Sequence, residues 1–412
     1  MSERVTITDA PWLASGPLSQ LMLALNSGGE EARVVGGAVR NALLGEPIGD
    51  IDIATTALPD EVLARAERAG FKAVPTGIAH GTVTVVIESR PFEVTTLRQD
   101  VETFGRHATV AFGRDWTVDA QRRDFTMNAL SAGLDGRVHD PVGGLPDLRA
   151  RHVRFIGEPS RRIEEDYLRI LRFFRFHAAY GRGDLDHDGL LACIRGREGL
   201  DRLSRERVRA ELVKLLVAPG AVATLTAMND SGLLTRVLAG VANLAHLERL
   251  VDIEQALPLP GAAMRRLGVM AVTIVEDAER LRDRLRLTNS EFDRLISIAE
   301  DWWRGPPPIP NRARAMLYEA GPENFTDHAL VGWSRSHAAV NDPAWAAYTT
   351  LPQRWSVPVF PLRAADFMTR GVAKGPALGA ALATAEHAWI AAGFPTDPAT
   401  VAQIADQAAR TD

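Results

Sequence analysis

Hydrophobic positions divide the chain into a first part with two periodicities and a longer remainder with one. Before about residue 158, short β-branched runs alternate with segments of helical spacing. From there onward strand signals nearly vanish and the chain is predicted to be helical. This order predicts an α/β head followed by an all-α remainder.

The pattern in the head predicts helices and strands separated by glycine and proline. The predicted elements are helices over 9–29, 38–44 and 59–69, and strands over 34–35, 50–54, 82–88 and 92–96. Gln99 to Thr117 is polar and punctuated by glycine, and it is predicted to be a mobile loop. Arg122 to Leu130 is predicted to start a helix, and its spacing alone favours Asp124 as a plain N-cap over a ligand contact.

The first helix of the remainder is predicted over Glu165–Ala179. Its apolar stripe, expected to face a core, contains Tyr167, Ile170, Leu171, Phe174 and Ala178. The opposite side contains Glu165, Asp166, Arg169 and Arg172. Judged by spacing alone, these charges are best explained as helix salt bridges of Glu165 and Asp166 with Arg169. Further along, Thr288 and Glu291 predict a capping box, and Pro306–Pro310 separates the last part.

One stretch of the head, Arg33–Thr56, combines two features with chemical potential. The first is Gly36-Gly37, which lies between a strand and a helix. Backbone amides at such a turn can approach a phosphate closely, and a helix N-terminus favours negative charge. Arg40, in the first turns of the helix, is placed to add a bidentate contact. A Gly-Gly pair before a helix is also a common plain turn, so this motif is weak by itself.

The second feature is a pair of acids, Asp50 and Asp52, one residue apart on the predicted strand. Their side chains are expected on one face of the sheet, and those of Ile51 and Ile53 on the other. Two adjacent carboxylates repel unless a cation lies between them, and hard oxygen ligands suit Mg²⁺. Glu93 could join them from a neighbouring strand, although a solvated edge glutamate fits equally well.

Composition excludes several classes of protein. The 412 residues are 46% hydrophobic and 24% charged, as expected for a globular chain of two or three domains. The single cysteine, Cys193, rules out an internal disulfide and favours a reducing compartment, which we expect to be the cytoplasm. No apolar segment is long enough to span a membrane, and the start of the chain does not resemble a signal peptide. The net charge of −5 does not predict nucleic-acid binding, but arginines cluster between residues 149 and 182 and suit a phosphate-rich partner.

The motifs together resemble one family closely. In chain order they are Gly36-Gly37-x-Val-Arg40, Asp50-Ile-Asp52-Ile-Ala-Thr, Glu93-Val-Thr-Thr-Leu-Arg, Arg122-Arg-Asp124-Phe-Thr-x-Asn128-Ala-Leu, Glu165-Asp166-x-x-Arg169 and Ser204-Arg-Glu206-Arg207. This order is similar to that of class II tRNA nucleotidyltransferases, the CCA-adding enzymes, and of the related bacterial poly(A) polymerases. The resemblance covers roughly residues 34–212, and the helical C-terminal half matches only in general character.

The resemblance implies a polymerase-β-like head over 1–157, a helical neck over 158–218 that recognises the base and binds RNA, and a helical body and tail over 219–412 that binds tRNA. It implies template-independent transfer of nucleotides from CTP and ATP to the 3′ end of tRNA, with no membrane and no protein partner. Asp50 and Asp52 would hold two Mg²⁺ ions, with Glu93 assisting the catalysis. The residues implied to bind the nucleotide are Gly36, Gly37, Arg40, Arg123, Asp124, Asn128, Asp166, Arg169 and Arg172.

Within that family reading, Asp166 and Arg169 are expected to select the base. A carboxylate paired with a guanidinium complements the donor and acceptor edges of cytosine and adenine, whereas guanine and uracil reverse that polarity. One departure is visible, because Asn41 stands where the family usually has aspartate. Both principal carboxylates are present, so activity is expected to survive.

The sequence leaves rival activities open. A poly(A) polymerase differs only in nucleotide preference and in lacking a stop. An enzyme that adds only CC or only A is a second rival, and a catalytically inactive RNA-binding protein on the same fold is a third. Retention of Asp50 and Asp52 argues against the third.

Overall fold

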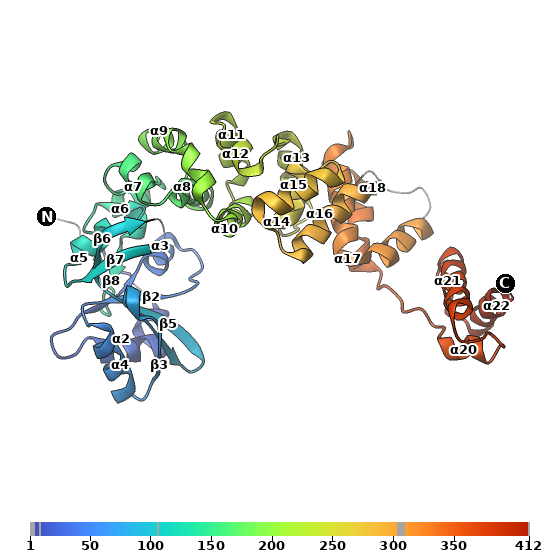
Figure 1. The fold of residues 1–412 in the computed structure, drawn as a ribbon, viewed down its shortest axis with the longest axis horizontal. Helices are drawn as coiled ribbons and strands as arrows, with labels where there is room; N and C mark the ends of the chain where they lie inside the picture. Colours follow the sequence, from blue (N-terminus) through green and yellow to red (C-terminus); the bar gives the residue numbers. More distant parts are fainter. Residues whose placement is uncertain (1–4, 8–9, 105–106, 303–309, 411–412) are drawn as a thin grey trace. The chain divides into compact units, whose positions relative to one another are not determined.

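The chain forms two compact units, Met1–Val237 and Leu238–Asp412. The computed structural model describes residues 5–7, 10–104, 107–302 and 310–410, with backbone alone for the described residues between 100 and 110. An α/β head is followed by helices, so the expected fold class is confirmed (Figure 1). The finer division at residues 157 and 218 stays a prediction.

The head is built on a seven-stranded sheet in the order β3-β4-β5-β2-β1-β8-β9. Its strands are β1 Ala32–Val35, β2 Asp52–Thr55, β3 Lys72–Gly77, β4 Thr82–Ile87, β5 Arg90–Thr96, β8 Ser131–Ala132 and β9 Val138–His139. A separate hairpin pairs β6 Arg98–Phe104 with β7 His107–Phe112. β2 and β5 run parallel, while the other described strand pairs are antiparallel.

Helices surround the sheet and continue beyond it. Those of the first unit are α1 Pro11–Ala14, α2 Pro17–Leu25, α3 Gly37–Leu44, α4 Pro59–Arg68, α5 Trp116–Gln121, α6 Gly144–Arg149, α7 Pro159–Glu165, α8 Leu168–Tyr180, α9 His187–Arg195, α10 Arg205–Leu216, α11 Ala221–Asp230 and α12 Leu233–Leu238, with 3₁₀ turns η1 Ile78–His80, η2 Thr126–Asn128 and η3 Arg197–Arg202. Those of the second are α13 Leu244–Ala256, α14 Ala263–Ala271, α15 Val275–Leu285, α16 Asn289–Asp301, α17 Pro310–Arg335, α18 Pro343–Thr349, α19 Leu351–Arg354, α20 Ala364–Met368, α21 Pro376–Ala391 and α22 Pro398–Ala408.

The two faces of the sheet differ in burial at strands β2 and β5. Ile53 and Val94 are paired in register and fully buried, and α4 packs against strands β3, β4 and β5. The side chains alternate along each strand, so Asp52 and Glu93 project from the opposite face, where both are exposed. The hydrophobic pattern therefore leaves one face free to carry polar chemistry.

Several sequence predictions were wrong at places where a helix is interrupted. The helix expected over 9–29 is two helices, because Gly16 has φ 78° and Pro17 begins α2. The helix expected over 165–179 is broken at Asp166, whose backbone is extended between α7 and α8. Helical periodicity continues across both interruptions, so it could not reveal either of them.

Two further predictions failed between residues 99 and 130. The expected loop forms the β6–β7 hairpin, where backbone pairing holds a polar segment in extended form, and then α5. The helix expected to start near Arg122 is absent, because α5 ends at Gln121 and only the short turn η2 follows. Strand β3 was not predicted, and its residues are mostly exposed, so the sequence carried little apolar signal there.

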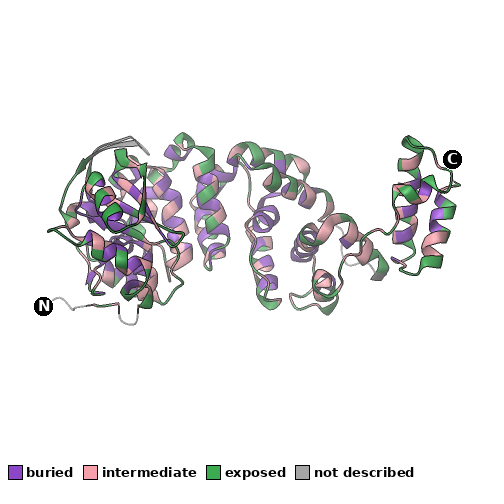
Figure 2. Ribbon diagram, turned by 90° about the horizontal axis from the view of Figure 1, so that it is seen from below, coloured by how far each residue is buried: buried purple, intermediate pink, exposed green. Residues whose placement is uncertain are grey.

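The second unit is built from helices packed along apolar faces. Buried positions line the inner sides of these helices (Figure 2). Gly321, with φ 75°, interrupts α17, and the predicted capping box of Thr288 and Glu291 opens α16. The terminal helices α20–α22 share a core that includes Phe367 and Trp389. The Pro306–Pro310 segment lies outside the described residues except for Pro310, and none of the described helices combines the length and apolar character needed to cross a bilayer.

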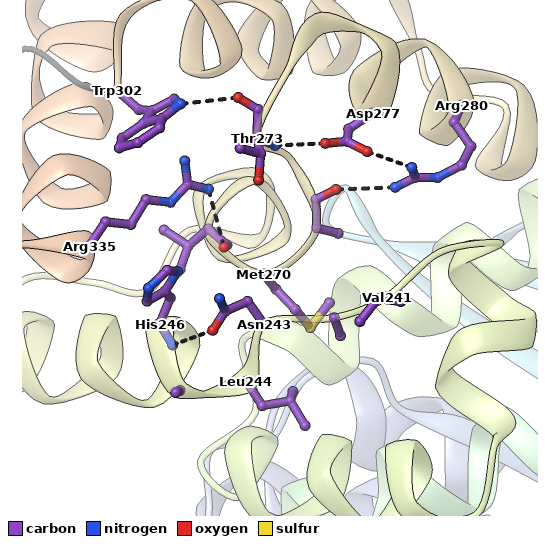
Figure 3. Close-up of a pocket in the computed structure, with 14 residues that line it drawn as sticks. Val241, Asn243, Leu244, His246, Met270, Thr273, Asp277, Arg280, Trp302 and Arg335 are labelled. Atoms are coloured by element: carbon purple, nitrogen blue, oxygen red, sulfur yellow. Dashed lines mark hydrogen bonds and ion pairs between the residues drawn. The ribbon is translucent and has the colours of Figure 1, made fainter.

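A cavity of about 630 Å³ lies among helix ends of this second unit (Figure 3). Its acid, Asp277, accepts from the backbone N–H of Thr273 at 2.9 Å and from Arg280 Nη1 at 2.6 Å. Arg335 stacks on Trp302 and donates through Nη2 to carbonyls at the end of α14. These contacts provide hydrogen-bond partners for backbone groups at the helix ends that line the cavity.

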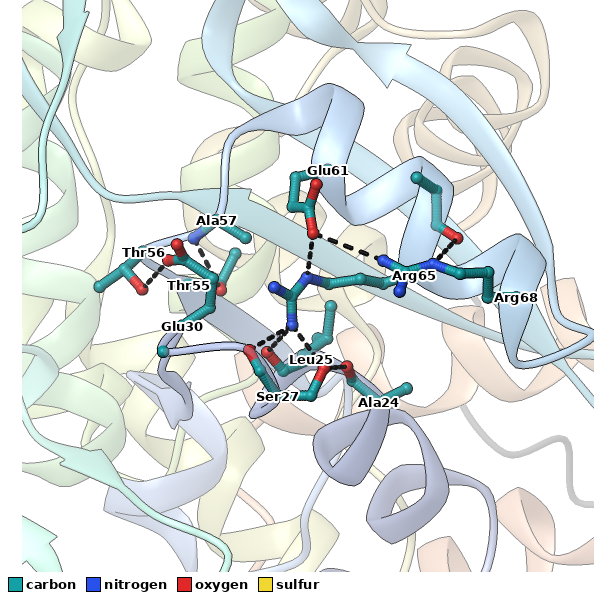
Figure 4. Close-up of polar contacts among 12 residues, drawn as sticks. Ala24, Leu25, Ser27, Glu30, Thr55, Thr56, Ala57, Glu61, Arg65 and Arg68 are labelled. Carbon is teal, nitrogen blue, oxygen red and sulfur yellow. Dashed lines mark hydrogen bonds and ion pairs between the residues drawn. The ribbon is translucent and has the colours of Figure 1, made fainter.

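A buried arginine, Arg65, holds the end of α2 and the segment that leads from it to β1 (Figure 4). Arg65 Nη1, from α4, donates to the Leu25 carbonyl at 3.1 Å and to the Ser27 carbonyl at 2.6 Å, just after α2 ends. Its Nε donates to Glu61 Oε1 at 2.8 Å. Arg65 is only 6% exposed, so its removal would leave buried carbonyls without a donor.

We therefore expect Arg65→Met to lower the free energy of unfolding by about 2 kcal/mol, measured by urea denaturation. Arg68→Met is the matched control on the same helix, because the Arg68 side chain is 68% exposed. It should change stability by less than about 0.5 kcal/mol. Equal effects of the two substitutions would contradict this role of Arg65.

Candidate active site

A cavity of about 450 Å³ in the first unit brings together side chains from four separate stretches of the sequence. Its lining consists of Gly36, Gly37, Arg40, Asp52, Arg123, Asp124, Asn128, Asp166, Arg169, Arg172 and Phe176. All nine residues that the family resemblance implied for nucleotide binding are among them. The volume is within the range of small-ligand sites.

The floor of the cavity includes the turn between β1 and α3. Gly36 has φ 67°, a conformation that side chains rarely adopt, and its N–H donates to the Leu130 carbonyl at 3.0 Å. A Cβ at Gly36 would also lie 3.4 Å from Arg123 Nη1. The turn therefore requires glycine, and it places the N-terminus of α3 at the cavity.

Arg40 lies deeper than the sequence suggested. It is 6% exposed, and Nη1 donates to Asn128 Oδ1 at 2.5 Å while Nη2 donates to the Tyr180 hydroxyl at 2.7 Å. Nε and Nη2 both donate to Asn41 Oδ1. Burial lowers the pKa of Arg40. The guanidinium lines the cavity, but each of its nitrogens already has a protein partner, so the simple bidentate phosphate contact predicted for it is not preformed.

Asp124 is a buried junction and not the N-cap that its spacing favoured. Oδ1 accepts from Asn128 Nδ2 at 3.0 Å and from the Phe125 N–H at 2.9 Å, while Oδ2 accepts from Arg172 Nε at 2.8 Å. Burial by itself would raise the pKa of Asp124, but Arg172 and these hydrogen bonds outweigh burial and lower it. A continuous chain of polar contacts thus links Arg40 to Arg172 on α8.

Two of the three predicted carboxylates are direct neighbours. Asp52 and Glu93 occupy paired positions on the parallel strands β2 and β5, as the strand pattern anticipated. Asp50 precedes β2 and is exposed in the connecting segment, so it does not share a strand with Asp52 as predicted. Desolvation and the charges of Glu93 and Asp50 raise the pKa of Asp52, and Arg123 opposes them.

This crowding of negative charge is what a cation would relieve. Among the described residues, no group of three acidic, histidine or cysteine side chains is close enough to enclose a metal by itself. Mg²⁺ in phosphate-transfer sites is usually held by one or two carboxylates together with substrate phosphates and water, so an incomplete protein shell fits that ion.

Asp166 and Arg169 both line the cavity, but they are not paired with each other as predicted. Asp166 Oδ2 accepts from Arg207 Nη2 at 2.6 Å, and Arg169 Nη1 donates to Glu165 Oε2 at 2.5 Å. Asp166 leaves helical geometry here, which turns its side chain away from the i,i+3 position that an unbroken helix would give. Each charge is therefore held by a separate partner.

Sequence reasoning missed three supporting residues, Phe176, Tyr180 and Glu211, and named Arg207 only as part of a motif, with no role. Phe176 lines the cavity, and the Tyr180 ring lies 3.9 Å from the guanidinium carbon of Arg40. Arg207 and Glu211 project from α10, with Glu211 accepting from Arg175. The two aromatics follow Arg172 at intervals of four residues, a signal that could have placed them on the arginine face. The α10 contacts depend on tertiary packing and had no such signal.

Aromatic packing holds α8 against the head. The ring centroids of Phe125 and Phe155 are 5.0 Å apart, those of Phe125 and Phe176 are 5.1 Å apart, and those of Phe155 and Phe173 are 5.3 Å apart. Phe125 and Phe173 are fully buried. This cluster brings the arginine face of α8 beside the Gly36 turn, and such pairs contribute about 0.5–1.5 kcal/mol each beyond area burial.

Known proteins match both the head and most of the chain. A family model of the poly A polymerase head domain matches residues 32–154, and one described as the probable RNA and SrmB-binding site of polymerase A matches residues 184–244. Together with the arginine-lined cavity, the head match defines a nucleotidyltransferase.

The particular family follows from full-length relatives. Mitochondrial CCA tRNA nucleotidyltransferase 1 of Mus musculus is 33% identical over 379 residues, covering 88% of this chain and 84% of that protein. The CCA-adding enzyme of Geobacillus stearothermophilus is 34% identical over 334 residues, covering 80% and 77%. The crystal structure of the Bacillus stearothermophilus CCA-adding enzyme with CTP has a TM-score of 0.72 at 28% identity, covering 97% and 98%. The chain belongs to the CCA tRNA nucleotidyltransferase family.

The Asp124 junction makes a testable contribution to stability. We expect Asp124→Asn to lower the free energy of unfolding by about 2 kcal/mol at pH 7, because Arg172 loses its nearest charged partner and keeps only the more distant Glu211. The pKa of Asp124 is lowered in the folded protein, so this contribution is present above the unfolded value near 3.9 and is lost as pH falls below it. Urea denaturation from pH 7 to pH 3 should therefore show the two proteins converging.

Asp188→Asn is the control for this series, because the Asp188 side chain is 84% exposed. Its stability should follow that of the parent at every pH. A constant difference between Asp124→Asn and the parent across the range would contradict the ionic role of Asp124.

Proposed function

We propose that this protein adds C and A nucleotides from CTP and ATP to the 3′ end of tRNA without a nucleic-acid template, releasing pyrophosphate. The observation that supports this most strongly is the convergence of Gly36, Arg123, Asp124, Asp166 and Arg169 on one cavity beside the strand carboxylates. Membership of the CCA tRNA nucleotidyltransferase family supports the choice of substrate.

In this proposal Asp50 and Asp52 would hold Mg²⁺ together with the phosphates of the nucleotide, and Glu93 would assist from the neighbouring strand β5. When bound, the divalent metal lowers the pKa of the attacking 3′-hydroxyl and neutralises charge on the leaving pyrophosphate. The described part of the chain supplies the Gly36-Gly37 turn and Arg123 for the phosphates. No covalent enzyme intermediate is required, because the 3′-hydroxyl attacks the α-phosphate directly.

Asp166 and Arg169 read the edge of the incoming base. Because Arg207 holds Asp166 and Glu165 holds Arg169, both charges are oriented before the base arrives. A base of the wrong polarity would place a donor against Arg169 or an acceptor against Asp166, so that polar groups of the base would lose hydrogen bonds to water without gaining one from the protein. The aromatic ring of Phe176 adds an apolar wall to the same cavity.

We infer that the enzyme works in the cytoplasm. The only cysteine, Cys193, is fully buried, and burial raises the pKa of its thiol, which suits an unreactive packing role in a reducing compartment.

The deciding experiment supplies tRNA lacking its 3′-terminal CCA with labelled CTP and ATP, separately and together, and sizes the products. We expect addition of two residues with CTP alone and of three with both nucleotides. A long A tract would favour a poly(A) polymerase, extension that stops at CC or adds only A would favour a partial enzyme, and no extension would favour a binding protein.

In the same assay Asp52→Ala should reduce incorporation of every nucleotide by at least about 10³-fold, while the affinity for tRNA stays within twofold.

Base selection is tested separately by Asp166→Ala. We expect the ratio of kcat/KM for CTP to that for UTP to fall by at least about tenfold, since one polar partner of cytosine is lost. Glu164→Ala is the nearby control, because Glu164 is exposed and does not line the cavity. An unchanged ratio in Asp166→Ala would exclude Asp166 from base reading.

A further inference from the structure

The side-chain amide of Asn41 makes hydrogen bonds through both its oxygen and its nitrogen. Oδ1 accepts from Arg40 Nε at 3.1 Å and from Arg40 Nη2 at 2.9 Å. Nδ2 donates to the Pro47 carbonyl at 2.7 Å. One side chain therefore touches the buried guanidinium of the cavity and the exposed segment that precedes the acidic strand.

Only an amide satisfies both contacts. An ionised carboxylate has acceptors alone, so aspartate could keep the bonds from Arg40 but would place an oxygen against the Pro47 carbonyl. Asn41 is thus matched to the path of its own following segment, although this position departs from the usual aspartate of the family.

The segment that Asn41 contacts is irregular, and a further contact holds it where Glu46 Oε1 lies 3.8 Å from Arg151 Nη1. Residues 46–51 have no regular secondary structure, and Glu46, Pro47, Gly49 and Asp50 are exposed. The Glu46 N–H donates to the Asn41 carbonyl at 2.9 Å, so backbone and side chain of Asn41 both hold this segment. Pro47 lies three residues before Asp50 and five before Asp52, which makes its position important for both carboxylates.

Through Arg40, Asn41 is also connected to residues that line the cavity. Arg40 connects Asn41 to Asn128, Asn128 connects to Asp124, and Asp124 connects to Arg172 on α8. Asn41 is therefore the junction between this chain of polar contacts and the segment that carries Asp50.

We propose that Asn41 is a positioning residue that holds the Asp50-bearing segment in register with the Arg40 network and thereby sets the affinity of the carboxylates for a divalent metal. The proposal rests on the proposed function, because it assumes that these carboxylates bind the metal with the nucleotide. In this proposal Asn41 binds neither the metal nor the nucleotide. It acts through its hydrogen bonds with Arg40 and Pro47.

The test compares Asn41→Asp with Asn41→Leu. Both substitutions remove the donor to Pro47, but only Asn41→Asp keeps acceptors for Arg40. Mn²⁺ binding is measured by electron paramagnetic resonance in the presence of CTP and without RNA, in about 0.15 M KCl to screen the added charge. We expect the Mn²⁺ concentration for half-saturation to rise about three- to tenfold in both variants, as loss of one hydrogen bond implies.

Turnover and thermal unfolding complete the comparison. The Mg²⁺ concentration for half-maximal CTP incorporation should rise by a similar factor in both variants, with KM for CTP at saturating Mg²⁺ less affected in Asn41→Asp than in Asn41→Leu. A merely structural role would lower the unfolding temperature and turnover while leaving Mn²⁺ binding unchanged, and that result would overturn the proposal. So would tighter Mn²⁺ binding in Asn41→Leu.

Failure of this proposal and failure of the proposed function are distinguishable. If the parent protein does not extend tRNA with CTP and ATP, the proposed function fails. If the parent is active and both variants bind Mn²⁺ as it does, only the role of Asn41 fails. Asn341→Asp, at an exposed position of the second unit, controls for an added negative charge and should match the parent in every measurement.

Discussion

The site depends on an ion pair between the buried Asp124 of the head and the half-buried Arg172 of α8. Asp124 is 9% exposed and spends both carboxylate oxygens on protein donors. Breaking a pair of this kind is costly because the remaining charge has lost its water as well as its partner. The phenylalanine cluster around Phe125 supplies the apolar burial that makes the pair possible. Together they hold an arginine-rich helix beside the glycine turn of the head.

The cavity distributes charge in two opposite ways. On its helical side Arg169 and Arg172 are each matched by an acid, so that their orientation is set before a ligand arrives. On its strand side Asp52 and Glu93 are neighbours of like charge, and Arg123 opposes the rise that they and burial cause in the pKa of Asp52. Preorganised cations suit a triphosphate and a base, while crowded anions suit a metal that comes with the nucleotide. The same cavity therefore combines oriented cations on one side with crowded carboxylates on the other, as the proposed function requires.

Arg40 shows that a residue lining the cavity can be held in place by several protein partners. The sequence pattern suggested a phosphate contact, but its guanidinium is buried against Tyr180 and bonded to Asn41 and Asn128. A charge held in this way contributes electrostatic potential and rigidity to the cavity. It also joins three elements around the cavity, because its nitrogens donate hydrogen bonds to residues of α3, η2 and α8.

Local chemistry in the sequence determined the strand–turn–helix around Gly36, the alternation that exposes Asp52 and Glu93, and the helical remainder. These features depend on near neighbours, since periodicity and glycine conformation act within a few residues. Tertiary structure alone decided that Asp166 pairs with Arg207, that Asp124 is a buried junction and that β6 pairs with β7. Those outcomes depend on partners up to 48 residues away, as for Arg172 and Asp124, and on backbone breaks that hydrophobic periodicity does not record.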